Sequence, residues 1–236
     1  MLLAFVGVSS QAQWNVSANR ESRAKAPAQV TAQDEVNIGH CKITDDIWPY
    51  DGLSLSYDSR VGVGAILTRN MFERYIGGKI VGMYVGWDDE ASTAQYDCFV
   101  RTSFTGENLT SGSSTVRFGW NRVDLDPILI PDADYLCIGF YTELKKNVVS
   151  IPFLYPKNTP NTIVLHSGEY DKDGKEVWYD MHQMENFGRM PVILIVSDEE
   201  GNYRNLITIN NVYANTVMMK DDVQSARIEL ANNGSN

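Results

Sequence analysis

Short apolar runs, separated by turn residues, recur along this chain, and some of them alternate apolar with polar positions. The run 53–57 alternates apolar with polar residues, and the run 61–67 opens by alternating valine with glycine. A period of two predicts strands whose two faces meet different surroundings. We expect strands over 39–43, 53–57, 61–67, 79–87, 96–104, 114–120, 121–125, 135–141, 148–154, 162–166, 177–181 and 191–196.

One segment carries helical signals instead. Thr68 is a candidate N-cap residue for a short helix over 69–76, and Gly77 and Gly78 follow as a stop. Elsewhere the connections are rich in Gly, Asp, Asn and Ser, the residues that turns prefer. Many short strands with so little helix predict an all-β fold. Specifically, we expect an antiparallel jelly-roll-like β-sandwich over 37–198, with one short helix.

The two ends of the chain differ from this central region. Residues 1–12 hold a short apolar run followed by small residues, which is typical of a signal peptide. Residues 13–36 lack a periodic apolar face and are expected to be a disordered linker. Residues 199–236 resume the strand pattern, at 206–209, 214–219 and 226–231. Because so few strands cannot bury a core, they either pair with the sandwich or begin a second, truncated β domain.

Composition narrows the class of protein further. The 236 residues carry a formal net charge of −10, which repels phosphate backbones, so we expect no nucleic-acid partner. No stretch is long and apolar enough to predict a transmembrane segment. Together with the predicted signal peptide, this indicates a protein that is secreted or held at the cell surface.

The three cysteines allow two interpretations. Cys41, Cys98 and Cys137 each lie in a strand-like apolar stretch, and free cysteine is among the most buried residue types. We therefore expect small core residues. A Cys98–Cys137 disulfide is the alternative, which would leave one thiol free.

Catalytic chemistry has little support in the residue pattern. His40 and Cys41 are neighbours, but neighbouring strand residues point to opposite faces. No Gly-x-Ser-x-Gly nucleophile elbow is present in the sequence. We expect a protein that is not an enzyme.

Aromatic residues next to acids are the better candidates for a binding site. Trp48 and Tyr50 fall in one expected loop, and Trp87 is followed directly by Asp88 and Asp89 at the end of a strand. Flat rings bind the apolar faces of sugars, and carboxylates accept hydrogen bonds from sugar hydroxyls. These five residues are the candidate ligand site, although packing in their loops is the favoured interpretation for the two tryptophans.

A metal site has one candidate. Asp171 and Asp173 precede Gly174 and resemble half of a calcium-binding loop, but further ligands at the right spacing are missing. A hairpin turn at Asp173-Gly174 is the favoured interpretation. No cofactor is expected, with calcium as the one possibility to test.

A series of segments resembles a known family. The most specific is Gly119-Trp120-Asn121-Arg122-Val123-Asp124-Leu125, preceded by the segments 78–86, 99–103 and 106–109 and followed by 136–140. In this order they resemble the jelly-roll β-sandwich modules of secreted Bacteroidetes surface proteins, of the cleaved-adhesin or galactose-binding-like type. The tail over 199–236 resembles the start of an immunoglobulin-like module.

This resemblance implies a non-catalytic secreted surface or adhesion module that binds a glycan or a host or cell-surface protein. The alternative that it implies is a structural accessory domain of a larger secreted peptidase or glycosidase, with further domains in the same chain. It transfers no binding residues, because the matching positions are framework positions and a shared fold does not determine function.

Overall fold

The part of the chain that the computed structural model describes comprises residues 14–16, 35–45, 47, 52–89, 92–148, 150–154, 159–184, 187–197, 207–214 and 226–232. Trp48 and Tyr50 of the candidate ligand site lie outside the described residues, and so does the predicted signal peptide over 1–12.

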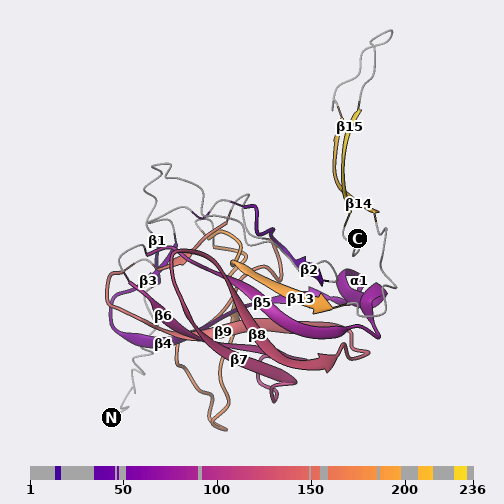
Figure 1. Cartoon of the computed structure of the whole chain (residues 1–236). Coiled ribbons are helices and arrows are strands. Elements are labelled where there is room, and N and C mark those ends of the chain that lie inside the picture. Colours follow the sequence, from indigo (N-terminus) through magenta and orange to yellow (C-terminus); the bar gives the residue numbers. More distant parts are fainter. Residues whose placement is uncertain are drawn as a thin grey trace, which may run out of the picture.

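Two antiparallel sheets form the body of the protein (Figure 1). The six-stranded sheet contains, in spatial order, β12 (Tyr179–Asp180), β11 (Val164–His166), β4 (Ser59–Thr68), β9 (Tyr135–Leu144), β6 (Ala94–Arg101) and β7 (Thr110–Val116). The four-stranded sheet contains β2 (Glu35–Gly39), β13 (Val192–Ser197), β5 (Lys79–Trp87) and β8 (Gly119–Leu129).

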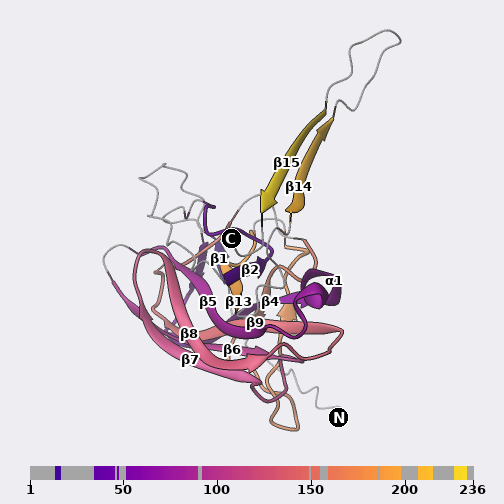
Figure 2. The same ribbon diagram turned by 45° about the vertical axis from the view of Figure 1, so that its right-hand side comes forward.

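Smaller elements complete the described chain. A third sheet joins β1 (Trp14–Val16), β3 (Gly52–Leu55) and β10 (Ile151–Pro152). The helix α1 (Arg69–Phe72) continues into one 3₁₀ turn, η1 (Glu73–Tyr75). The hairpin of β14 (Ile207–Ala214) and β15 (Ala226–Asn232) stands apart from the sheets, as both views show (Figures 1 and 2).

The period-two pattern places the core between the two large sheets. On β4, Val61, Val63 and Leu67 are completely buried, and they join one cluster with Val192 and Leu194 of β13 in the opposite sheet. Because successive strand residues alternate between faces, the residues between them lie on the outer side of each sheet. The inward-facing apolar positions of the two sheets therefore share the main core, and smaller apolar clusters cover part of the outer face of each sheet.

The outer face of the six-stranded sheet is lined with glycine where other segments cross it. A Cβ atom on Gly62 would lie 2.4 Å from Cη2 of Trp178, and one on Gly64 would lie 2.8 Å from the ring of Phe104. Only glycine leaves room for these two rings to pack directly against the strand. The segment that carries Trp178 is thereby held against the sheet.

The two large sheets approach each other closely where β7 passes β8. The Thr110 hydroxyl donates a hydrogen bond to the Asp126 carbonyl at 2.6 Å, and a Cβ atom on Gly112 would lie 2.1 Å from the Asp124 carbonyl oxygen. This contact joins the edges of two different sheets without a ladder of backbone hydrogen bonds between them. A glycine at position 112 is what permits it.

The all-β, antiparallel sandwich expected from the pattern is confirmed, with one short helix as predicted. The jelly-roll order of its strands stays a prediction. Thr68 precedes α1 with an extended backbone, although its side chain does not cap the helix. Gly77, with a φ of +105°, follows η1.

Several strand boundaries differ from the expectation. The strand expected over 39–43 is β2, which ends at Gly39, and of the strand expected over 148–154 only Ile151–Pro152 is described as a strand, β10. The predicted strands 114–120 and 121–125 are instead β7 and β8, because the turn between them falls at residues 117–118. Asn121 holds this turn with hydrogen bonds to the Arg117 amide at 3.1 Å and the Arg117 carbonyl at 2.6 Å. Gly119 takes a φ of +98°, which side-chain-bearing residues rarely adopt.

The predicted linker over 13–36 contains β1 and the first two residues of β2. In the predicted second domain over 199–236, the described residues form one hairpin that pairs with neither large sheet. Of the strand expected over 214–219, only Ala214 is described, at the end of β14. The immunoglobulin-like character of this segment stays a prediction.

All three cysteines are free and buried, as small core residues would be. Cys98 and Cys137 lie on the neighbouring strands β6 and β9, but Cys98 is opposite Phe140 and Cys137 is opposite Arg101. An odd offset between paired strands places two residues on opposite faces of the sheet. The alternative of a Cys98–Cys137 disulfide is therefore wrong.

Candidate functional site

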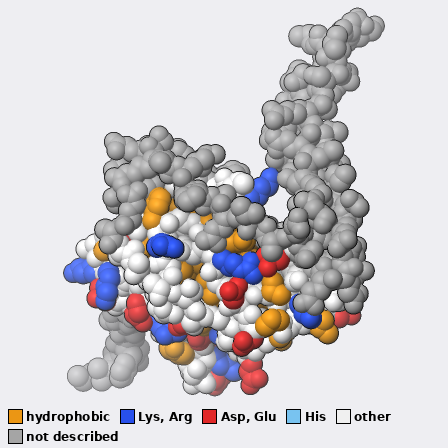
Figure 3. All heavy atoms as spheres, in the orientation of Figure 1, with side chains coloured by type: hydrophobic (Ala, Val, Ile, Leu, Met, Phe, Trp, Pro, Cys, Tyr) orange, Lys and Arg blue, Asp and Glu red, His pale blue; other side chains and the backbone are white. Residues whose placement is uncertain are grey.

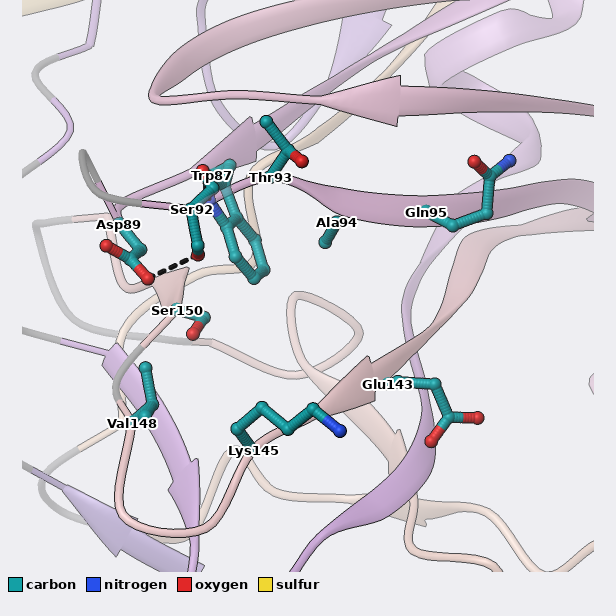
Figure 4. A pocket seen from close by; sticks show the side chains of 10 residues that line it. All are labelled: Trp87, Asp89, Ser92, Thr93, Ala94, Gln95, Glu143, Lys145, Val148 and Ser150. Atoms are coloured by element: carbon teal, nitrogen blue, oxygen red, sulfur yellow. Dashed lines mark hydrogen bonds between the residues drawn. The ribbon is translucent and has the colours of Figure 1, made fainter.

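A pocket of about 400 Å³ opens where β5 ends and β6 begins, next to the end of β9 (Figure 4). Strand β6 runs antiparallel to β9, so the start of one strand lies beside the end of the other. The polar side chains of the lining are Asp89, Ser92, Thr93, Gln95, Glu143 and Lys145, together with Ser150, and the apolar ones are Trp87, Ala94 and Val148.

Trp87 forms a wall of this pocket rather than an exposed platform. Only 3% of the residue is exposed, its Nε1 donates to the Ser92 carbonyl at 3.2 Å, and its ring meets Tyr96 edge to face at 5.9 Å between centroids. These contacts fix the orientation of the indole. The ring therefore packs at the end of β5, as part of the main core cluster, while it also lines the pocket.

Asp88 is buried and does not line the pocket. It is 2% exposed, and its backbone amide donates to the Ser150 carbonyl at 3.0 Å. Burial, and after it the nearby charge of Asp88, raises the pKa of Tyr96 far above its ordinary value. The Tyr96 hydroxyl stays protonated and donates to the Gly86 carbonyl at 3.0 Å.

Asp89 does face the pocket. Its Oδ2 accepts a hydrogen bond from the Ser92 hydroxyl, the contact drawn as a dashed line in Figure 4. A carboxylate has room for several donors, since its two oxygens offer about four acceptor positions. Asp89 is thus a positioned acceptor at the mouth of the pocket.

Glu143 and Lys145 lie across the pocket from Trp87 and Ser92 (Figure 4). The Lys145 ammonium is 3.5 Å from Oδ2 of Asp58, whose other carboxylate oxygen accepts from the Lys146 amide at 2.7 Å. The Lys146 amide, and with it the Lys145 charge, lowers the pKa of the exposed Asp58 carboxyl. The pocket thus offers carboxylate, ammonium, amide and hydroxyl groups around one indole.

Of the sequence candidates, Trp87 and Asp89 line this pocket, Asp88 does not, and Trp48 and Tyr50 lie outside the described residues. Sequence reasoning missed Gln95, Glu143 and Lys145. These residues stand in ordinary alternating strands or strand ends, and no local motif marks them. Only the pairing of β6 with β9 brings them to Trp87.

The calcium candidates form a turn. Oδ1 of Asp171 accepts from the amides of Asp173 at 2.8 Å and Lys175 at 2.9 Å, and Gly174 has a φ of +76°. A bridge between Tyr170 and Glu176 closes the turn, in agreement with the hairpin interpretation. Across the described ranges, no group of three or more His, Cys, Asp or Glu side chains is arranged to hold a metal ion.

A second group of side chains lies on the outer face of the six-stranded sheet, and we call it the outer cluster. Its members are Phe99, Arg101, Phe104, Tyr141, Glu176 and Trp178. Oε2 of Glu176 accepts from the Tyr141 hydroxyl at 2.5 Å and from Trp178 Nε1 at 3.1 Å, and it lies 3.4 Å from Arg101 Nη1. These groups satisfy one another and hold the segment that carries Trp178.

The cysteine and histidines that could serve as catalysts are engaged in packing. Burial is the main cause that raises the pKa of Cys41 to about 12, so the thiolate is scarce near neutral pH. His40 Nε2 lies 2.7 Å from the Ile66 carbonyl, and His166 Nδ1 lies 2.9 Å from the Val177 carbonyl. One ring nitrogen of His40 and one of His166 is therefore already bonded to a backbone carbonyl.

Comparison of the chain with protein-family models, with curated proteins and with solved structures finds no match. Within the described part of the chain, no helix is long and apolar enough to cross a membrane.

Proposed function

We propose that this protein is a non-catalytic secreted surface or adhesion module that binds a glycan in the pocket beside Trp87. One observation carries the proposal: a single concavity combines an indole wall with oriented carboxylate, amide and hydroxyl groups. Sugars present an apolar face of C–H groups and a rim of hydroxyls, so they use both kinds of lining at once.

The size and charge of the site support the same class of ligand. A volume of about 400 Å³ falls within the range of small-molecule sites, roughly 300–1,000 Å³. Acidic and basic side chains are interspersed on the face seen in Figure 3 and form no continuous basic patch there. With a net charge of −10, this favours an uncharged polyhydroxylated ligand over a polyanion.

A glycan array probed with the full chain tests the proposal. We expect retention on a subset of glycans, and a loss of roughly 10-fold in affinity on Glu143→Gln or Asp89→Asn, because each change removes a charged acceptor. Glu107→Gln is the matched control. Glu107 is an exposed residue beyond the far end of β6, where the same chemical change leaves the pocket intact.

Absence of retention on every glycan would contradict the proposal and favour the alternative, a structural accessory domain of a larger secreted peptidase or glycosidase. Equal affinity of the Glu143→Gln, Asp89→Asn and control variants would place any glycan binding elsewhere on the molecule.

A further inference from the structure

Beyond the pocket, exposed polar side chains continue along the outer face of the six-stranded sheet. We call this surface the polar strip, and it consists of Arg60, Gln95, Asp97, Ser113, Thr115 and Glu143. The ladder places Gln95 opposite Thr115, Asp97 opposite Ser113, and Arg60 opposite Glu143. Residues that face each other in an antiparallel pair share a face of the sheet. Asp97 is also opposite Tyr141 on β9, and Glu143 follows Tyr141 by two residues, so the three pairs lie on the same face and form one surface.

The strip is continuous with the pocket. Gln95 and Glu143 line the pocket and also belong to the strip. Asp97 follows Gln95 by two residues on the same strand, a step of about 6.8 Å along the same face. A chain-like ligand that leaves the pocket between Gln95 and Glu143 therefore meets Asp97 and Arg60 next.

The side chains at the centre of the strip are held in place and accessible. Asp97 accepts from the Ser113 hydroxyl at 2.9 Å through Oδ1 and from Arg60 Nη2 at 2.9 Å through Oδ2. The Arg60 guanidinium also lies over the Tyr141 ring, 5.2 Å from its centroid. Side-chain exposures of 57% for Arg60 and 41% for Asp97 leave both open to a ligand.

This combination fits a polyhydroxylated chain better than a protein surface. Protein interfaces draw most of their binding energy from a few well-packed anchors, most often Trp, Tyr or Arg. Arg60 is the only residue of that kind among the six. The other five are acidic, amide or hydroxyl side chains, and the Tyr141 ring beneath Arg60 is only 9% exposed. Preorganised polar groups of this kind lose little side-chain entropy when they bind a sugar hydroxyl.

We propose that Arg60, Asp97 and Ser113 form a second subsite, so that the ligand is an oligosaccharide that extends from the pocket along the polar strip. This inference rests on the proposed glycan binding and specifies its ligand class. The pocket holds the terminal unit, and the carboxylate of Asp97 and the guanidinium of Arg60 bind hydroxyls of the next units.

Calorimetric titration of the full chain with glucose, galactose, mannose and N-acetylglucosamine oligomers, each from monosaccharide to hexasaccharide, tests the length dependence. We expect the affinity for the series that binds to rise about 10-fold between the shortest and the longer members. In Asp97→Asn, this gain disappears while the affinity for the monosaccharide stays as in the unchanged protein. Ser113→Ala, a milder change, reduces the gain in part.

Asp126→Asn is the matched control, because Asp126 is an exposed aspartate on β8 of the other sheet. Equal affinity for all lengths, or an equal loss at all lengths in Asp97→Asn, would overturn the second subsite while glycan binding stands. If no member of any series binds and the glycan array is also empty, the proposed function fails together with this inference.

Discussion

Arg122 on β8 binds Glu35 on β2 through two hydrogen bonds of 2.5 and 2.8 Å, although these strands are the opposite edges of the four-stranded sheet. Side-chain exposures of 29% for Arg122 and 11% for Glu35 place the pair largely out of water. A two-point contact between a guanidinium and a carboxylate is stronger and more directional than a single hydrogen bond. The pair links β2, the first strand of the sandwich, to β8 at the opposite edge of the same sheet.

Loss of this pair should destabilise the sandwich measurably. Arg122 also binds Asp124, at 2.7 Å, through its Nε. We expect Glu35→Gln or Arg122→Met to lower the free energy of unfolding by about 1–3 kcal/mol, because either change removes the two-point contact at the largely buried Glu35. Urea unfolding of the two single variants and the double variant gives the coupling between them. The exposed pair Lys145–Asp58 is the comparison, and its coupling should stay below about 1 kcal/mol. A coupling near zero for Arg122 and Glu35 would contradict the linking role.

Gly62 should resist substitution because of Trp178. In Gly62→Ala the new methyl group would meet the indole at 2.4 Å, and we expect a loss of about 1–3 kcal/mol in unfolding free energy. In a Trp178→Ala background the same change should cost much less, since the indole is gone. Urea unfolding of the four proteins measures this difference, and an equal cost in both backgrounds would show that Trp178 does not pack on Gly62.

Glu176 should make the stability depend on acid pH. Burial favours the neutral form, but hydrogen bonds from Tyr141 and Trp178, with the charges of His166 and Arg101, outweigh it and lower the pKa of the Glu176 carboxyl. The folded state therefore binds this proton less readily than the unfolded state. Its contribution is complete above the unfolded pKa and is lost as the pH falls through the lower folded pKa.

The variant Glu176→Gln isolates this effect. We expect it to be less stable than the unchanged protein by about 1–2 kcal/mol near neutral pH. The difference should shrink as the pH falls below about 4.5, the ordinary pKa of this side chain. Urea unfolding of both proteins between about pH 7 and pH 3 measures this difference in the free energy of unfolding. A difference that stays constant over that range would show that the carboxylate charge contributes nothing.

Gly112 should be the least replaceable residue of β7. A methyl group there would lie 2.1 Å from the Asp124 carbonyl oxygen, a backbone atom that cannot move without shifting β8. We expect Gly112→Ala to cost more than about 2 kcal/mol in thermal or urea unfolding. Ser111→Ala, at the exposed neighbouring position, should stay within about 0.5 kcal/mol. Equal stability of the two variants would contradict the close approach of the sheets.

The three cysteines should be unreactive in the folded protein. Burial is the main cause that raises the pKa of Cys41 and Cys137 to about 12, and it raises the pKa of Cys98 further. We expect no reaction with a thiol reagent at neutral pH and the reaction of all three thiols in denaturant without reductant. A reactive thiol in the folded state, or a missing thiol in the unfolded state, would disagree with three buried free cysteines.

Much of the fold follows from residue pattern, and less of the candidate site does. The predicted strand over 79–87 coincides with β5, because its ends are marked by glycine and by acidic loop residues. Trp87 and Asp89 were recognisable as candidates because they are neighbours in sequence. Glu143, Lys145 and the polar strip carry no such mark, since each is an ordinary polar residue of a strand or of a strand end, and its partners are distant in the chain.

The sequence by itself determined which positions face inward, because a strand alternates its side chains whatever it pairs with. It also determined that strands dominate and that many of the turns fall at Gly, Asp and Asn, whereas the turn at 117–118 lies at Arg and Phe and was not predicted. Only the tertiary structure decided which faces and edges meet. From the sequence alone, Glu35 is predicted to belong to a linker and Gly62 is a weak strand residue. In the structure, Arg122 binds Glu35 and the Trp178 ring packs on Gly62. The physical reason is that the register of strand pairing brings together residues that are far apart in the chain. The local propensity of a residue carries no information about which distant residue it will contact.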